Sequence, residues 1–223
     1  MTYYEPIFFD IETTGLNPMA QHFWSEADYA AQVTAVGIGQ MDNWREGQSW
    51  EDAEYEVECY IDNSEYSLLQ QIQSVVEAKV EYVRESGGTP YLVGFNSRNY
   101  DHPYLGARFA RLRLDGSVFN HDTQRLDMMR ALGKHWDGVG RYPSEDDCLE
   151  ELGIASNDPY DGSDMPDAFS NGNFEAIITH VKADVEEMMK LFVAKKEECV
   201  QEYYDHYDIE ADATFTETWT EGE

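Results

Sequence analysis

Residues 7–16 read Ile7-Phe8-Phe9-Asp10-Ile11-Glu12-Thr13-Thr14-Gly15-Leu16. The apolar run from Ile7 to Ile11 is interrupted only by Asp10, which predicts a strand buried in the middle of a sheet. Asp10 and Glu12 stand two residues apart and therefore point to the same face of that strand. A carboxylate on a buried strand is unfavourable unless it is paired or binds a metal ion. The stretch thus predicts a cation site, with a strand end whose acids face water as the alternative.

The spacing of this acidic pair is weak evidence by itself, because 45 of the 223 residues are Asp or Glu. An acid-x-acid pair should arise by chance roughly nine times in a chain of this composition. The buried setting of Asp10 and Glu12, and not their spacing, is therefore what carries the prediction.

Hydrophobic patterning outward from this strand predicts an α/β fold. We expect strands at residues 7–11, 33–39, 54–61, 90–95 and 117–123. We expect helices at residues 66–84, 102–114, 144–152 and 173–204. The third strand alternates at period two and should lie half-exposed near an edge, and Ser144 should cap its helix. This order of elements predicts a central mixed sheet of five strands flanked by helices.

Composition limits the class of protein. A chain of 223 residues that is 42% hydrophobic suits one domain, which we expect at residues 1–204, followed by an acidic flexible tail at 205–223. No stretch approaches the ~20 consecutive apolar residues of a membrane span, and no signal peptide is recognisable, so we expect a cytoplasmic protein without a membrane partner. Cys59, Cys148 and Cys199 form no metal-binding or disulfide pattern and are expected to pack as small hydrophobes.

The charge balance is extreme, with 45 acidic against 15 basic side chains and a net charge of −30. Such a surface repels nucleic acid at low salt. Acidity spread over the whole chain indicates a halophilic protein, because screening shortens the Debye length to ~3 Å at 1 M salt. An ordinary acidic protein with an acidic tail is the alternative. Equal thermal stability in low and in molar salt would reject the halophilic interpretation.

Three motifs resemble those of the DEDD superfamily of 3'–5' exonucleases. The first is Phe9-Asp10-Ile11-Glu12-Thr13-Thr14-Gly15-Leu16. The second is Asn96-Ser97-Arg98-Asn99-Tyr100-Asp101-His102-Pro103-Tyr104-Leu105, and the third is His180-Val181-Lys182-Ala183-Asp184-Val185. Two further stretches, Gly94-Phe95-Asn96 and His121-Asp122-Thr123-x-x-Leu126-Asp127, are similar to predicted exonucleases related to the proofreading domain of family B DNA polymerases. The resemblance covers about residues 5–195, with only a pattern match between the motifs.

The resemblance implies a ribonuclease H-like fold with an active site at the carboxyl end of the first strand. It implies that two divalent cations are held by four carboxylates, those of Asp10, Glu12, Asp101 and Asp184. Asp10 would bridge the two ions. Oxygen ligands of this kind select Mg²⁺ or Mn²⁺, and ions about 3.5–4 Å apart suit phosphodiester hydrolysis. The implied reaction releases 5'-mononucleotides from the 3' end of a nucleic acid.

His180 is the candidate general base, because imidazole titrates near neutrality and can take a proton from the attacking water. It precedes Asp184 by four residues, so both share one helix face. This spacing departs from the family pattern, in which the histidine branch places His five residues before the Asp and the tyrosine branch places Tyr four before it. A solvated helix histidine without a chemical role is the alternative. A His180→Ala variant that kept most of its activity would reject the base role.

Other side chains are candidates for weaker roles. Thr13, Asn96 and Arg98 are expected to contact the substrate, although Arg98 is equally well an ordinary surface residue. Asp122 and Asp127 are expected to be structural or capping carboxylates, with facing the site as the alternative. Exposed tryptophans, from the set Trp24, Trp44, Trp50 and Trp136, would stack on bases, although such residues more often pack. The loop 17–32 is a candidate lid.

Single-stranded DNA is the favoured substrate, because a narrow acidic cleft accepts a frayed strand more readily than a duplex. RNA is an open alternative, since nothing in the sequence senses a 2'-hydroxyl. A non-catalytic scaffold that binds nucleic acid or a protein is the rival from another class, but such a scaffold has no reason to bury four carboxylates. A structural cation-binding protein is a second rival, and the absence of a D-x-D-x-D-G loop argues against a calcium module.

Overall fold

The computed structural model describes residues 4–15, 31–42, 50, 53–120, 123–133 and 142–207. Several sequence expectations concern residues outside this part of the chain. These are most of the candidate lid, Trp24, Trp44, Trp136, Asp122, and residues 208–223 of the expected tail.

The sheet has five strands among the described residues, in the order β3-β2-β1-β4-β5. They are β1 Tyr4–Thr13, β2 Val33–Asp42, β3 Glu54–Ile61, β4 Thr89–Gly94 and β5 Gln124–Asp127. β2 is antiparallel to both β1 and β3, whereas β4 is parallel to both β1 and β5. The predicted mixed sheet is therefore confirmed, with β1 at its centre and the half-exposed β3 at an edge.

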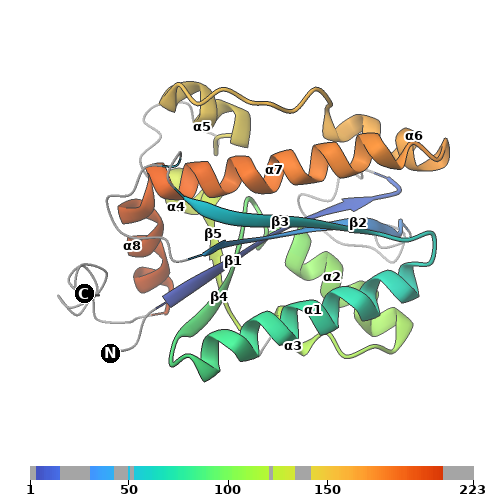
Figure 1. The fold of residues 1–223 in the computed structure, drawn as a ribbon, viewed down its shortest axis with the longest axis horizontal. Helices are drawn as coiled ribbons and strands as arrows, with labels where there is room; N and C mark the ends of the chain where they lie inside the picture. The colour runs from blue at the N-terminus through green and yellow to red at the C-terminus, as the bar shows by residue number, and fades with distance from the viewer. Residues whose placement is uncertain are drawn as a thin grey trace.

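Helices cover both faces of the sheet (Figure 1). They are α1 Glu65–Glu85, α2 Asp101–Leu112, α3 Ser117–Asn120, α4 Met128–Gly133, α5 Glu145–Leu152, α6 Met165–Ser170, α7 Phe174–Ala194 and α8 Lys196–Tyr207. The long helix α7 crosses one face with α5 and α6 outside it, while α1, α2 and α3 lie on the other face. In the described part of the chain no helix combines the length and the apolarity needed to cross a membrane.

The alternation of side chains along β1 sorts them between two cores. Ile7, Phe9 and Ile11 pack with α1 and α2 on one face, and all three are almost fully buried. Phe8 points the other way and packs with residues of α7, including Val185. Positions of the same parity as Phe8 face α7, so the carboxylates two and four residues further along β1 are directed toward that helix.

Two glycines of β2 let α7 lie close to the sheet. A Cβ added at Gly37 would stand 2.7 Å from Val181 Cγ1 and from Val185 Cγ2. A Cβ added at Gly39 would stand 2.6 Å from Val185 Cγ1 and 2.8 Å from Met189 Sδ. Because real Cβ contacts are longer than this, any larger residue would push the helix away from the strand. The glycines therefore fix the depth at which α7 presents its side chains.

The predicted fifth strand at 117–123 is wrong. Residues 117–120 form the short helix α3, and the strand begins at Gln124. Asp115 accepts a hydrogen bond from Ser117 N, which starts a turn, and Phe119 then inserts into the core beside Phe9 and Phe109. The apolar pair Val118 and Phe119, which suggested a strand, is instead buried by the single helical turn of α3.

The single helix predicted at 173–204 is also wrong, because it is two helices. Asn173 caps α7 by accepting from Ala176 N, and α7 ends at Ala194, because the next residue, Lys195, has a φ of −127° that is not helical. α8 then begins at Lys196 and contacts α4 and β5. The helix predicted at 144–152 is confirmed, with a capping box between Ser144 and Asp147.

Candidate active site

The carboxyl end of β1 faces α7 and brings three ligand-bearing side chains together. Glu12 comes from the strand, and His180 and Asp184 come from one face of the helix. His180 Nε2 lies 3.2 Å from Glu12 Oε1 and 3.4 Å from Asp184 Oδ2. One ligand atom from each of the three residues lies within 4.8 Å of the others. The pairing register between β1 and β2 also shifts between Glu12 and Thr13, so the regular ladder is interrupted beside the site.

Asp101 reaches the same end of the sheet from the turn after β4. β4 runs parallel to β1, so the carboxyl ends of the two strands meet at one edge. In the turn, Asn96 has a φ of 56° and its carbonyl accepts from the N–H groups of Asn99 and Tyr100. Asp101 is the first residue of α2 and is 3% exposed. The turn therefore delivers a buried carboxylate beside the strand end.

Asp127 holds this turn in place. Its carboxylate accepts hydrogen bonds from the N–H groups of Asn96, Arg98 and Met129 at 3.0–3.1 Å. The side chain is fully buried at the end of β5. The expectation that Asp127 is a structural carboxylate is confirmed by these bonds.

A cleft of about 480 Å³ joins the predicted site residues. Its polar lining includes Asp10, Glu12, Thr13, Asn96, Tyr100, Asp101, Glu145, Asp158, His180, Asp184 and Glu187. The structure thus brings all four predicted carboxylates and His180 into one cavity. Thr13 Oγ1 donates to Gly15 O at 2.9 Å and lies 3.3 Å from the Tyr100 hydroxyl, so the wall next to Glu12 is fixed.

Burial and mutual repulsion raise the pKa values of the predicted carboxyl groups that line the cleft. Burial raises the pKa of Asp10 well above its usual range, and the charges of Asp101 and Asp184 raise it further. Burial likewise raises the pKa of Asp101, and it raises that of Asp184 to about 7. Burial alone would lower the pKa of His180, but its carboxylate neighbours, beginning with Glu12, raise it to about 10. A single imidazole cannot neutralise this many carboxylates, so the site favours added positive charge.

The donor set fits a hard divalent cation. The four predicted ligands that line the cleft are all carboxylates, and hard oxygen donors are those preferred by Mg²⁺ and Mn²⁺. The buried acids also raise one another's pKa, which is the situation a bound cation relieves.

The structure does not bring Arg98 into the cleft, which corrects the expectation of a substrate contact. Its guanidinium donates to Arg125 O at 3.0 Å and lies 2.8 Å from His206 Nδ1 and 3.8 Å from Glu202 Oε1. The side chain is therefore committed to β5 and α8 on the far side of the turn. Asn96, by contrast, lines the cleft, and its side-chain oxygen accepts from Asn99 Nδ2 rather than from its own backbone.

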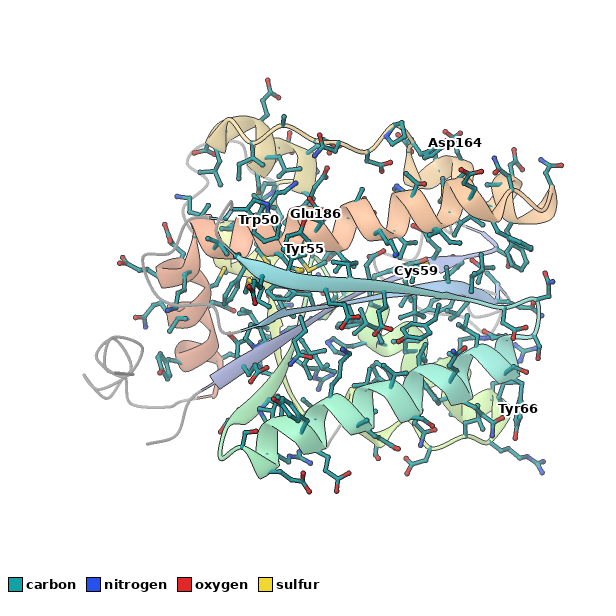
Figure 2. The ribbon with its side chains drawn as sticks, viewed as in Figure 1. Trp50, Tyr55, Cys59, Tyr66, Asp164 and Glu186 are labelled. Atoms are coloured by element: carbon teal, nitrogen blue, oxygen red, sulfur yellow. The ribbon has the colours of Figure 1, made fainter. Side chains whose placement is uncertain are left out.

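Trp50 packs rather than facing the cleft. Its ring lies 4.5 Å from that of Tyr55, with Lys190 Nζ 5.7 Å from the indole centroid. Figure 2 shows Trp50, Tyr55 and Glu186 gathered where β3 passes α7. A role for Trp50 in stacking on bases finds no support in this position.

Beyond the predicted carboxylates, five acids line the cleft: Glu145, Asp146, Asp158, Asp161 and Glu187. Asp158 bonds to His180 Nδ1, and Glu187 accepts from Asn157 N at 3.0 Å. Glu145 has a buried Oε1 without a hydrogen-bond partner among the described residues, and burial followed by the charge of Asp184 raises its pKa well above the usual range. A helical stripe of His180, Asp184 and Glu187 could have indicated Glu187, but Glu145 and Asp158 come from an acid-rich segment with no local signal.

A family model for the RNase H superfamily matches residues 7–196. No curated protein matches the chain in sequence. The structure resembles the family B DNA polymerase from the hyperthermophilic archaeon Pyrobaculum calidifontis over 84% of this chain, with 16% identity and a TM-score of 0.53. It resembles exonuclease I over 91% of this chain, with 15% identity and a TM-score of 0.55. The chain matches only 24% and 44% of those two longer chains, and at such identities the likeness shows a shared fold.

Proposed function

Because this chain belongs to the RNase H superfamily, we propose that it is a metal-dependent 3'–5' exonuclease. The observation that carries the proposal is the joint presence of Asp10, Glu12, Asp101, Asp184 and His180 in one cleft at the carboxyl end of β1. Exonuclease I shares the fold, which supports the interpretation of the cleft as an exonuclease active site. A scaffold without catalysis gains nothing from acids that raise one another's pKa in this way.

The carboxylates would hold two divalent cations, Mg²⁺ or Mn²⁺. Bound cations of this type lower the pKa of a water molecule and offset the negative charge that builds up on a phosphodiester during hydrolysis. Asp10 and Glu12 supply oxygens from the rigid central strand, Asp101 from the start of α2 and Asp184 from α7. Three separate elements must therefore be correctly packed before the site is complete.

His180 is the proposed general base. Its Nε2 faces Glu12 and Asp184 at hydrogen-bond distance, so a water molecule held beside these carboxylates would lie within its reach. The imidazole is 5% exposed and is not a solvated helix histidine. Its position four residues before Asp184 thus places a base on the same face as a ligand.

The substrate proposed is a single strand, with DNA favoured over RNA. The acidic lining repels a phosphate backbone unless cations or high salt intervene, so access through the 3' end of a frayed strand is easier than docking of a duplex. Thr13 and Asn96 line the cleft and are the proposed contacts to the sugar-phosphate backbone. No residue of the lining identifies the sugar, which leaves RNA as an outcome of the test.

Digestion of 5'-labelled single-stranded DNA and RNA with Mn²⁺, in low and in molar salt, tests the proposal. We expect a ladder that shortens from the 3' end with wild type and disappears with Asp10→Ala/Glu12→Ala. Glu54→Ala/Glu56→Ala is a matched control, because it removes an acid-x-acid pair from an exposed stretch of β3. Absence of cleavage by folded wild type would reject the enzyme and favour a binding scaffold.

A further inference from the structure

One carboxylate outside the family motifs contacts the candidate base directly. Asp158 Oδ2 bonds to His180 Nδ1, the ring nitrogen opposite the one that faces Glu12 and Asp184. Both partners are nearly inaccessible, with side-chain exposures of 7% for Asp158 and 6% for His180. The contact joins residues 22 positions apart, so it depends on the tertiary fold and not on helix geometry.

The segment that carries Asp158 is held against α7. The second carboxylate oxygen, Oδ1, accepts from Tyr160 N at 3.0 Å, which fixes the plane of the carboxylate. Asp158 N donates to Ser156 Oγ at 3.1 Å, and the neighbouring Asn157 N donates to Glu187 Oε1 at 3.0 Å. Asp158 therefore approaches the imidazole from a segment attached to the same helix on which His180 stands.

Gly162 completes the enclosure of the ring. A Cβ added at this position would lie 3.3 Å from His180 Nε2 and 3.8 Å from His180 Cε1. The segment that bonds Nδ1 therefore also passes close to the Nε2–Cε1 edge of the imidazole. A ring confined in this way has little freedom to flip and exchange its two nitrogens.

We propose that Asp158 is a positioning residue that fixes the rotation and tautomer of His180, a role that rests on the exonuclease function proposed above. The carboxylate at Nδ1 accepts an N–H from that nitrogen, so Nε2 is the ring nitrogen directed into the cleft. Nε2 can accept a proton once bound cations offset the charges of Glu12 and Asp184, which otherwise keep it protonated. During hydrolysis the O–H bond of the attacking water breaks and an Nε2–H bond forms, while the electron pair stays on the water oxygen. The resulting imidazolium faces the negative charge of Asp158, which stabilises it.

A purely structural contact is the competing explanation, in which Asp158 only attaches its segment to α7. The two explanations differ in what they predict for Asp158→Asn, since the amide oxygen still accepts from Nδ1–H but has no charge. If the contact is only structural, Asp158→Asn should largely preserve it and leave turnover unchanged. A positioning carboxylate would lose its electrostatic contribution to turnover while ring orientation was retained.

The kinetic experiment compares wild type, Asp158→Asn and Asp158→Ala on the labelled single strand. We expect kcat to fall about 10–100-fold for Asp158→Ala, as for other residues that orient an active-site group. Asp158→Asn should lie between Asp158→Ala and wild type, and KM should stay within about twofold, because a positioning residue acts through His180 and not through substrate binding. Asp147→Ala is the matched control, since it breaks the capping box of α5 without touching His180.

NMR of ¹⁵N-histidine-labelled protein supplies a readout that does not depend on turnover. In metal-free and in Mg²⁺-loaded wild type we expect a hydrogen-bonded Nδ1 proton on His180. That signal should persist in Asp158→Asn and be lost in Asp158→Ala. An unchanged His180 spectrum in Asp158→Ala, or an unchanged kcat in a folded Asp158→Ala, overturns the proposal. Inactive wild type would instead reject the exonuclease function, and the positioning role with it.

Discussion

Two groups of buried carboxylates among the described residues differ in whether the protein supplies a partner for their charge. In the first, between α1 and α2, Glu65 pairs with Arg108, whose Nε donates to Glu65 Oε1 at 2.7 Å and whose Nη2 also bonds to the carboxylate. Val33 N donates to the same Oε1 at 2.8 Å. In the second, the cleft between β1 and α7, Asp10, Asp101 and their neighbours face one another across a cavity.

The difference shows which group of acids the chain can satisfy by itself. The hydrogen bond to Glu65 raises the pKa of Arg108, so the guanidinium stays charged in this buried site. In the cleft the acids raise one another's pKa, and His180 is the one basic side chain among the described residues of the lining. The Glu65 site is thus complete within the fold, whereas the cleft needs cations from solution.

The largest expected effect is the loss of activity in Asp10→Asn. Removing this carboxylate should lower kcat on the order of 10³-fold or more, which corresponds to a loss of about 4 kcal/mol of transition-state stabilisation. The free energy of unfolding without metal should stay equal or increase, because one source of like-charge repulsion is gone. Single-turnover kinetics and urea unfolding measure the two quantities. Activity close to that of wild type would contradict the proposed role.

Arg108→Leu tests the first site. It leaves Glu65 buried without its guanidinium, and the unfolding free energy should fall by about 3–5 kcal/mol. A double variant, Glu65→Leu/Arg108→Leu, should recover part of this loss because no charge is left buried, although Val33 N then lacks its acceptor. Urea unfolding of wild type, Arg108→Leu and the double variant measures the three unfolding free energies. A drop below about 1 kcal/mol, as for exposed ion pairs, would show that the site is not buried as described.

Several expectations from sequence hold because they depend on local pattern. The run around Phe8 and Phe9 is the central strand, and the alternation of residues 54–61 marks an edge strand. The local pattern predicted the wrong element where a short helix buries its side chains on one side only. Phe119 reaches the core from a single helical turn, so its apolar neighbourhood mimicked a strand.

The residues of the candidate site likewise fall into those that a local motif indicated and those that it did not. Residues in recognisable motifs, such as Asp10 and Asp184, could be named from sequence and do share the cleft. Asp158 could not, because its importance arises only from folding a distant segment onto His180. Arg98 lies in a motif and was expected either to contact the substrate or to be an ordinary surface residue. Its side chain is directed to α8, an element that the sequence pattern had merged with α7.

Mg²⁺ should stabilise the protein through the cleft and not through the Glu65 site. At a metal concentration 100 times the dissociation constant, a ligand that binds only the folded state adds about 2.7 kcal/mol to the unfolding free energy. We expect this gain in wild type and in the Glu65→Leu/Arg108→Leu variant, and its loss in Asp10→Asn/Asp184→Asn. Urea unfolding with and without Mg²⁺ measures it. An equal gain in all proteins would indicate binding elsewhere.

The smallest expected effect comes from Gly39→Ala. This change disturbs the packing of α7 against β2 and leaves every acid of the cleft in place. The added methyl would meet Val185 Cγ1 and Met189 Sδ at 2.6 and 2.8 Å. Overpacking of this kind destabilises by about 1–3 kcal/mol. Thermal or urea unfolding checks the value, with the exposed Thr179→Ala on α7 as the reference. No change in stability would show that α7 does not depend on the glycine.

A titration of the metal-free protein with Mn²⁺, followed by calorimetry and by the loss of the free-ion electron paramagnetic resonance signal, tests the central claim most directly. We predict two bound ions per chain in wild type and in the Glu65→Leu/Arg108→Leu variant, and none at the same concentrations in Asp10→Asn/Asp184→Asn. No binding by folded wild type, or equal binding by the cleft variant, would contradict the claim that the crowded acids of the cleft form a cation site.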